Sequence, residues 1–238
     1  KEKRQAVISH AVTKGLNPDV PMKDSGVEWI GEVPVHWGIT RLKNECINIV
    51  DCLHSTPDYT DDGRYPAIRT ADISSGKLDV DNARKVTAAT YRERNIRLVP
   101  AHGDIIYSRE GERFGLGATV PEGANVCLGQ RVMLFRAKET PGFLMWALNA
   151  ESTYRQAQQD VIGSTSPHVN VETIKNFCFA WPPMEEREQI AAWISTMSDK
   201  LEKKINTAPL GARLDDAIAL WGEADEYEES DEYEDTTV

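Results

Sequence analysis

The sequence lacks the marks of several large protein classes. No apolar run is long enough to cross a bilayer, and no signal peptide is found. The four cysteines are scattered without a Cys-x-x-Cys pair, which fits reduced thiols in a cytoplasmic protein better than a disulfide framework. There is no P-loop, and no Gly-x-Gly-x-x-Gly follows a strand pattern. These absences argue against a membrane protein, a disulfide-rich secreted protein and a nucleotide-binding enzyme.

Catalytic and metal-binding motifs are also missing. Cys46, Cys52 and His54 lie close together, but their spacing matches no common zinc pattern, so a buried cysteine and a surface histidine are the simpler interpretation. The tetrapeptide Asp/Asn-Pro-Pro-Tyr/Phe of amino-methyltransferases is absent, because the similar stretch Trp181–Met184 differs at its first and last residues. We therefore predict no catalytic residue, no metal site and no cofactor in this chain.

What the chain does have is enough apolar sequence for one sizeable core. It contains 238 residues, 40% of them hydrophobic, which suffices for one core with or without helical appendages. It begins at Lys1, without an initiator Met and inside a helical pattern, which is typical of a fragment.

The charge is strongly negative but unevenly placed. The net charge is −11, yet nine acidic residues and no basic ones lie between Glu223 and Asp235, and we expect the segment 223–238 to be a disordered acidic tail. Residues 1–222 then hold 27 basic and 29 acidic side chains, a net of −2. From Arg64 to Arg136 there are 12 Lys and Arg against 8 Asp and Glu, a local +4. Phosphate binding depends on such local charge, although an ordinary solvated surface would explain it too.

Hydrophobic spacing predicts a helix at each end of a central domain. Residues 1–14 show helical spacing and stop at Gly15, and residues 15–37 form a Gly- and Pro-containing linker whose Trp29 and Trp37 should pack against the domain. Between 38 and 181 the pattern changes to short apolar runs and turns, with strands expected at 39–49, 65–70, 104–108, 117–120, 131–137 and 177–180. A helix is expected at 143–159 and a further turn at 171–174. Helices segregated from a mixed sheet indicate an α+β fold.

The segment 182–206 is the clearest helix. Its first turns are acidic and its last turns basic, so both ends complement the helix dipole. Apolar residues recur along it as a seam of the coiled-coil type: Ile190, Ile194, Met197, Leu201 and Ile205. We favour a partner helix over packing on the chain's own domain, because the far end carries many charges. Residues 207–222 should form a short amphipathic helix.

Four blocks of this sequence resemble one protein family. The first two enclose the domain: Lys23–Trp37 (KDSGVEWIGEVPVHW) and Trp181–Ile194 (WPPMEEREQIAAWI). The third runs from Gly103-Asp104 through the Pro121–Gly123 turn to Leu128–Arg131, and the fourth is the polar loop Gly163–Asn170. In this order they resemble the specificity (S) subunit of type I restriction–modification systems. The chain looks most like the second, C-terminal target-recognition domain with the end of one spacer helix and the start of the next.

The resemblance implies a DNA reader that performs no chemistry itself. One half of a split target in double-stranded DNA would be read, and methyltransferase (M) subunits and a restriction (R) subunit would use S-adenosylmethionine, ATP and Mg²⁺. A second S half is a further partner that the resemblance allows. After Asn206 the chain departs from the family pattern, since Pro209 breaks the helix and the acidic tail replaces a basic segment. Two other interpretations stay open: the recognition part of a fused restriction enzyme–methyltransferase, and a decayed half-subunit that acts as a decoy or regulator.

Candidate DNA contacts lie in three segments. Arg109 and Arg113 lie in a Gly-rich loop and could donate to guanine or phosphate, but Arg109 could equally form a structural ion pair with Glu110, Glu112 or Asp104. The basic stretch 64–97 matches no family block, and in this family such variable surface loops differ with the DNA target; its candidates are Arg69, Lys77, Arg84 and Lys85. The polar loop 163–170 offers Ser164, Thr165, His168 and Asn170, which are ordinary turn and cap residues as well.

Overall fold

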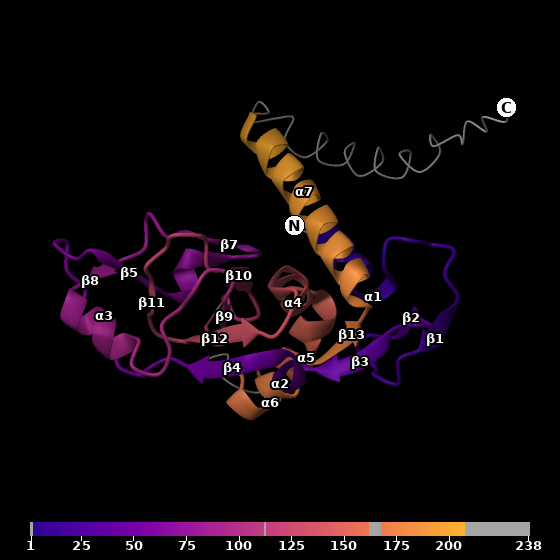
Figure 1. Cartoon of the computed structure of the whole chain (residues 1–238), viewed down its shortest axis with the longest axis horizontal. Coiled ribbons are helices and arrows are strands. Elements are labelled where there is room, and N and C mark those ends of the chain that lie inside the picture. The colour runs from indigo at the N-terminus through magenta and orange to yellow at the C-terminus, as the bar shows by residue number, and fades with distance from the viewer. Residues whose placement is uncertain (1, 112, 162–167, 208–238) are drawn as a thin grey trace, which may run out of the picture. The chain divides into compact units, whose positions relative to one another are not determined.

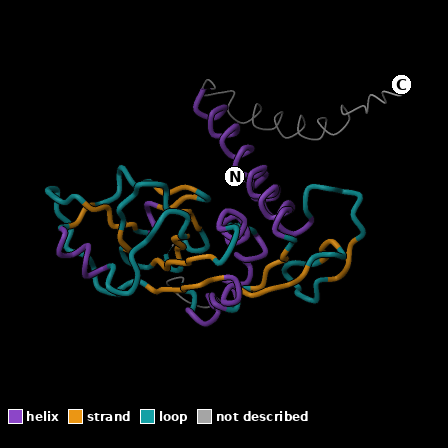
Figure 2. Tube along the Cα trace, in the orientation of Figure 1, coloured by secondary structure: helices purple, strands orange, loops and turns teal. Residues whose placement is uncertain are grey.

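The computed structural model describes residues 2–111, 113–161 and 168–207 (Figure 1). The chain divides into two compact units, Lys1–Ala192 and Trp193–Val238, and the domain lies in the first. Helices, strands and long loops are combined in this unit, which confirms the α+β class (Figure 2). No helix within the described ranges is long and apolar enough to span a membrane.

A four-stranded antiparallel sheet forms the centre of the domain. Its order is β10 (Gly117–Thr119), β9 (Ile105–Ser108), β12 (Val132–Ala137) and β4 (Cys46–Asp51). The central strands β9 and β12 are buried on both faces, so their sequences read as continuous apolar runs rather than as alternating ones. On one face Ile106, Val132 and Leu134 join a core cluster, and on the other Tyr107 contacts the rings of Phe135 and Phe177.

A smaller lobe adjoins one end of this sheet. It contains the three-stranded sheet of β11 (Cys127–Leu128), β5 (Tyr65–Ile68) and β8 (Lys85–Val86), with the helix α3 (Ala88–Arg94) packed beside it. The rings of Tyr65 and Tyr91 stack with centroids 4.2 Å apart and join strand to helix. The short helix η1 (Thr70–Asp72) and the hairpin of β6 (Ile73–Ser74) and β7 (Lys77–Leu78) continue from β5. Figure 1 shows the arrowhead of β4 pointing toward this lobe.

Two expected elements are interrupted in the structure. The single strand predicted at 39–49 is wrong, because α2 (Leu42–Glu45) separates β3 (Gly38–Arg41) from β4 while Leu42 turns into the core. The single helix predicted at 143–159 is also wrong, because it is split into α4 (Pro141–Leu148) and α5 (Glu151–Val161). At the break between α4 and α5, the side chain of Asn149 accepts a hydrogen bond from the amide of Gly117 at 3.1 Å and donates one to its carbonyl at 2.8 Å. These two bonds attach the break to the first residue of β10.

The N-terminal helix and the end of the linker both pack on the domain. The helix α1 (Glu2–Lys14) buries Ile8, Ala11 and Val12, and Trp37 is buried at the end of the linker. Within the linker the structure contains a hairpin that the sequence analysis missed, β1 (Met22–Asp24) with β2 (Glu32–Pro34). Its strands are three residues long and β1 is exposed, so no apolar alternation marks them.

The last strand and the long C-terminal helix close the domain. The strand β13 (Cys178–Trp181) pairs with β3, and α7 (Met184–Thr207) follows it. Arg187 donates to the carbonyl of Pro182, the hydroxyl of Thr140 and the carboxylate of Glu139, at 3.1, 2.7 and 3.1 Å. Its guanidinium also lies 4.5 Å from the ring centroid of Trp181. Arg187 thereby fixes where the helix begins.

The apolar seam of α7 is partly covered within the single chain. Ile190 and Ile194 are 2% and 1% exposed, and Met197 is half-buried. Packing on the chain's own domain, the alternative that we did not favour, therefore applies to Ile190, which lies in the first unit. The side chains of Leu201 and Ile205 lie outside those that the structure describes, and their pairing with a partner helix stays a prediction.

We expect Arg187→Ala to lower the free energy of unfolding by about 2 kcal/mol, because it leaves the carbonyl of the buried Pro182 without this donor and removes the guanidinium from the ring of Trp181. Urea unfolding of the purified chain measures this. Glu188→Ala, an exposed neighbour on the same turn, is the matched control and should stay within about 0.5 kcal/mol of the parent. Equal stability of the two variants would show that Arg187 does not hold the helix.

Candidate nucleic-acid interface

Antiparallel pairing brings the ends of several strands to one edge of the central sheet. Asp51 at the end of β4 lies opposite Met133, and Ser108 at the end of β9 lies opposite Val132 at the start of β12. An isolated bridge between Glu110 and His168 adds the segment after α5 to the same edge. We call this set of side chains the polar edge; its members are Asp51, His54, Arg109, Glu110, Gln130, Arg131 and His168.

Arg109 lies beneath this edge rather than on its surface. Its side chain is 2% exposed, with Nη2 3.0 Å from a carboxylate oxygen of Glu110 and Nη1 donating to the carbonyl of Val169 at 3.3 Å. Nε lies 3.1 Å from Oδ1 of Asp51, an ion pair by distance that lacks the alignment of a hydrogen bond. The expectation of an outward Arg109 is thereby corrected, since burial leaves the guanidinium no approach to DNA. The structural ion pair is the alternative that matches these contacts.

Glu110 connects three segments of the polar edge. One carboxylate oxygen lies 3.0 Å from both Arg109 Nη2 and His168 Nδ1, and the other lies 3.8 Å from Arg131 Nε. Two backbone bonds act in parallel, because the amide of Val169 donates to the carbonyl of Arg109 and the amide of Arg109 donates to the carbonyl of Arg131, each at 3.1 Å. The exposed His168 is therefore held in place, whereas Ser164 and Thr165 lie outside the described residues.

Arg94 fastens the loops of the polar edge to the smaller lobe, and the sequence analysis missed it. The side chain is buried at the end of α3 and donates to the carbonyls of Leu53 and Ser55, each at 2.9 Å. It also donates to the carbonyls of Leu128 and Gly129. One guanidinium thus joins the segment after β4 to the turn before β12. Nothing in the sequence Tyr-Arg-Glu-Arg distinguishes the buried Arg94 from Arg92, which is exposed.

Two of the four predicted basic residues of this region lie at one aromatic ring. Arg84 is exposed and lies 5.4 Å from the ring centroid of Tyr59, and Arg69 lies 6.0 Å from the same ring. Arg69 is half-buried and pairs with Asp72 at 2.7 Å, and the hydrogen bond that it donates to the Asp72 carboxylate raises the pKa of Arg69. Lys85 is exposed on β8 beside Arg84. Burial raises the pKa of the Tyr59 phenol, so this ring remains neutral beside the cations.

The other predicted contacts are dispersed. Lys77 is exposed on the β6–β7 hairpin, and Arg113 is exposed but donates to the carbonyl of Ala71 at 3.0 Å. Asn170 caps α6 (Val171–Lys175) by accepting from the amide of Glu172 at 2.9 Å, which matches the cap alternative for this residue. Cys52 is buried and His54 is exposed, as the interpretation of that pair expected.

The relatives of the chain agree with the sequence blocks. The family model described as the type I restriction modification DNA specificity domain matches residues 37–208. The chain belongs to this family. A curated relative from Methanocaldococcus jannaschii, named "Putative type I restriction enzyme MjaX specificity subunit", is 25% identical over 187 residues, which are 74% of this chain and 43% of that protein. The resemblance found in the sequence is thereby confirmed.

Two solved structures share the fold of this specificity domain. The HsdS subunit from Thermoanaerobacter tengcongensis is 16% identical with a TM-score of 0.55, and the match covers 94% of this chain and 50% of that one. A chain from work on complex assembly and conformational transition of the type I R-M system is also 16% identical, with a TM-score of 0.58 and coverage of 92% and 48%. The chain therefore spans about half the length of the relatives it matches.

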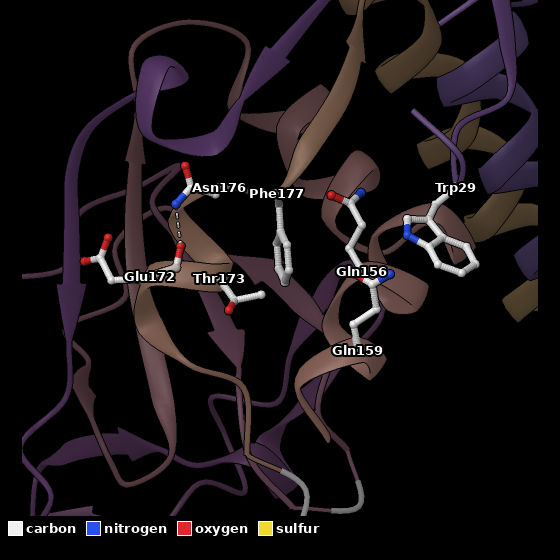
Figure 3. A pocket seen from close by; sticks show the side chains of 7 residues that line it. All are labelled: Trp29, Gln156, Gln159, Glu172, Thr173, Asn176 and Phe177. Carbon is white, nitrogen blue, oxygen red and sulfur yellow. Dashed lines mark hydrogen bonds between the residues drawn. The ribbon is translucent and has the colours of Figure 1, made fainter. Parts of the chain in front are cut away.

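The specificity domain also has an open hollow of about 430 Å³ between the linker, α5 and α6 (Figure 3). Trp29, Gln159 and Phe177 line it together with Gln156 and Asn176, whose amides are engaged in the fold. Gln156 exchanges two hydrogen bonds with the backbone of Cys178, and Asn176 accepts from Lys43 at 2.8 Å. None of the residues that line the hollow belongs to the polar edge, so we assign the hollow no part in the interface.

We expect Arg94→Lys to lower the free energy of unfolding by about 2 to 3 kcal/mol, because a single ammonium cannot serve four carbonyls and leaves some of them buried without donors. Arg92→Lys, the same change two residues away on an exposed face, is the control and should have little effect. Guanidinium chloride unfolding of both variants compares them. Matching midpoints would contradict the role given to Arg94.

Proposed function

We propose that this specificity domain reads one half of a bipartite target in double-stranded DNA and directs partner methyltransferase and restriction subunits to it. The observation that carries the proposal is the family match over residues 37–208, a family described by DNA specificity. The arrangement of side chains supports it, because exposed cationic and polar groups project from a rigid sheet edge and from the adjoining lobe. A sheet edge and a separate lobe that both carry exposed polar groups suit a protein that needs fixed contacts to phosphate and variable contacts to bases.

The lobe of β5, β8 and α3 is the part to which we assign sequence readout. Arg84 and Lys85 are exposed there on short segments, and Tyr59 supports the guanidinium of Arg84 from below. An arginine held against an aromatic face loses less rotamer freedom when it forms a bidentate contact. Each good bidentate pair is worth about 1–3 kcal/mol of discrimination between bases.

The reaction chemistry belongs to partners in this proposal. Methyl transfer and cleavage would need S-adenosylmethionine, ATP and Mg²⁺ on those subunits, and this chain would supply recognition alone. The later part of α7, with Met197, Leu201 and Ile205, would pair with a second spacer helix, from another S half or another part of a longer S subunit. That pairing would set the distance between the two half-sites.

The function is tested by selection of DNA. Methylome sequencing of cells with and without the gene identifies a motif that depends on it, and the purified chain with its methyltransferase partner is then offered duplexes with and without that motif. We expect at least a thousandfold preference for the motif at physiological salt. Binding to the methyltransferase with no preference for any duplex would support the decoy interpretation and contradict ours. A gene fused to catalytic domains would support the fused enzyme.

Arg84→Ala should weaken binding to the motif by about 1–3 kcal/mol and relax the choice of base at one position. Fluorescence anisotropy on a panel of duplexes, each with one altered base pair, measures both effects. Lys23→Ala removes an exposed positive charge from β1 in the linker and is the matched control. A uniform loss of affinity across the panel would show that Arg84 contacts phosphate and reads no base.

A further inference from the structure

Arg131 has a backbone conformation that an arginine seldom adopts. Its φ is +64°, and among the described residues only one other non-glycine residue, Thr140, has a positive φ. In this region the Cβ of an L-residue crowds the backbone, and glycine is the residue that fits without cost. A side chain that is kept at such a position commonly serves a function that glycine could not.

The turn that contains Arg131 is held at both of its ends. The amide of Gly129 donates to the carbonyl of Ile68 at 2.7 Å, and a Cβ on Gly129 would lie 2.5 Å from that oxygen. The carbonyl of Arg131 accepts from the amide of Arg109 at 3.1 Å, and β12 begins at the next residue. The turn is therefore fixed on the lobe by Gly129 and on the sheet by Arg131.

The side chain of Arg131 is presented outward from this fixed point. It is 59% exposed, and its ion contact with Glu110 is long, at 3.8 Å from Nε to the carboxylate. Glu110 is closer to Arg109 and His168, at 3.0 Å each, so its charge is largely engaged with them. His54 and His168 expose their rings on the same edge, each beside a carboxylate. Arg131 thus carries the exposed guanidinium of the polar edge.

We propose that Arg131 binds a backbone phosphate of the DNA and fixes the position of the domain along the duplex. This inference rests on the proposed function and adds a contact that the sequence analysis did not name. A phosphate is favoured over a base because Arg131 lies in a three-residue turn between β11 and β12. So short a turn keeps the guanidinium close to the sheet. There it would meet the phosphate backbone on the outside of a duplex before it could reach the base edges within a groove. Phosphate contacts of this kind set register and carry no sequence information.

Three substitutions at this one position test the proposal. Arg131→Gly and Arg131→Asn remove the charge while they tolerate the left-handed backbone, so the melting temperature should be unchanged or higher. Arg131→Lys keeps a positive charge that can still reach a phosphate.

We expect the Gly and Asn variants to bind about tenfold more weakly to motif and non-motif duplexes alike, with a salt slope lower by about one. The Lys variant should recover most of the affinity. Anisotropy titrations of the full chain with its methyltransferase partner, at several salt concentrations, measure these values. Unchanged affinity in the Gly and Asn variants, or a loss confined to the motif duplex, would overturn the phosphate contact.

The unsubstituted chain separates this failure from failure of the function. If it prefers its motif and the Gly variant equals it at every salt concentration, the phosphate contact is wrong and the reader function stands. If the unsubstituted chain prefers no duplex, the proposed function is wrong, and Arg131 loses its assigned ligand with it.

Discussion

The buried guanidinium of Arg109 is the constraint on which the polar edge depends. It touches Asp51 at the end of one strand, Glu110 after another and the carbonyl of Val169 after a third segment. A buried charge of this kind adds little net stability, since the cost of desolvation offsets most of the attraction. Its value lies in specificity of arrangement, because any other packing of these three segments would leave charges buried without partners. Exposed neighbours such as His168 therefore project from a defined place.

Much of the fold could be predicted from the sequence, and the errors have a common cause. The buried runs at 104–108 and 131–137 became β9 and β12, and the apolar spacing after Pro183 became α7. The interruptions at Leu42 and Asn149 could not be predicted, because each is made by contacts with residues far away in the sequence. The bond from Asn149 to Gly117, for example, joins positions 32 residues apart. Periodicity reports a local preference and does not show which strand edge lies nearby.

The candidate site was harder to predict, because residue type does not tell which way a side chain points. Four arginines of the locally basic stretch are occupied in the fold: Arg69 with Asp72, Arg94 with carbonyls, Arg109 with Asp51 and Glu110, and Arg136 with Asp104 at 2.7 Å. A count of charges between Arg64 and Arg136 therefore overstates the cations available to a phosphate. Arg131 lies at the end of the third sequence block with no residue pattern that marks it as a contact, since the positive φ that distinguishes it exists only in the folded turn.

The two groups of exposed cations differ in how they are attached, and this difference fits their assigned tasks. Arg131 is fixed to the sheet by the bond from the amide of Arg109 to its own carbonyl, and β12 begins at the next residue. Arg84 and Lys85 lie on the surface of a lobe whose interior is joined to the sheet by Arg94 and by the bond from Gly129 to Ile68. Because those joints use backbone carbonyls and amides, the lobe surface can accept other side chains without disturbing them. Under the proposed function, a domain built in this way could alter the bases it reads while it keeps its place on the duplex.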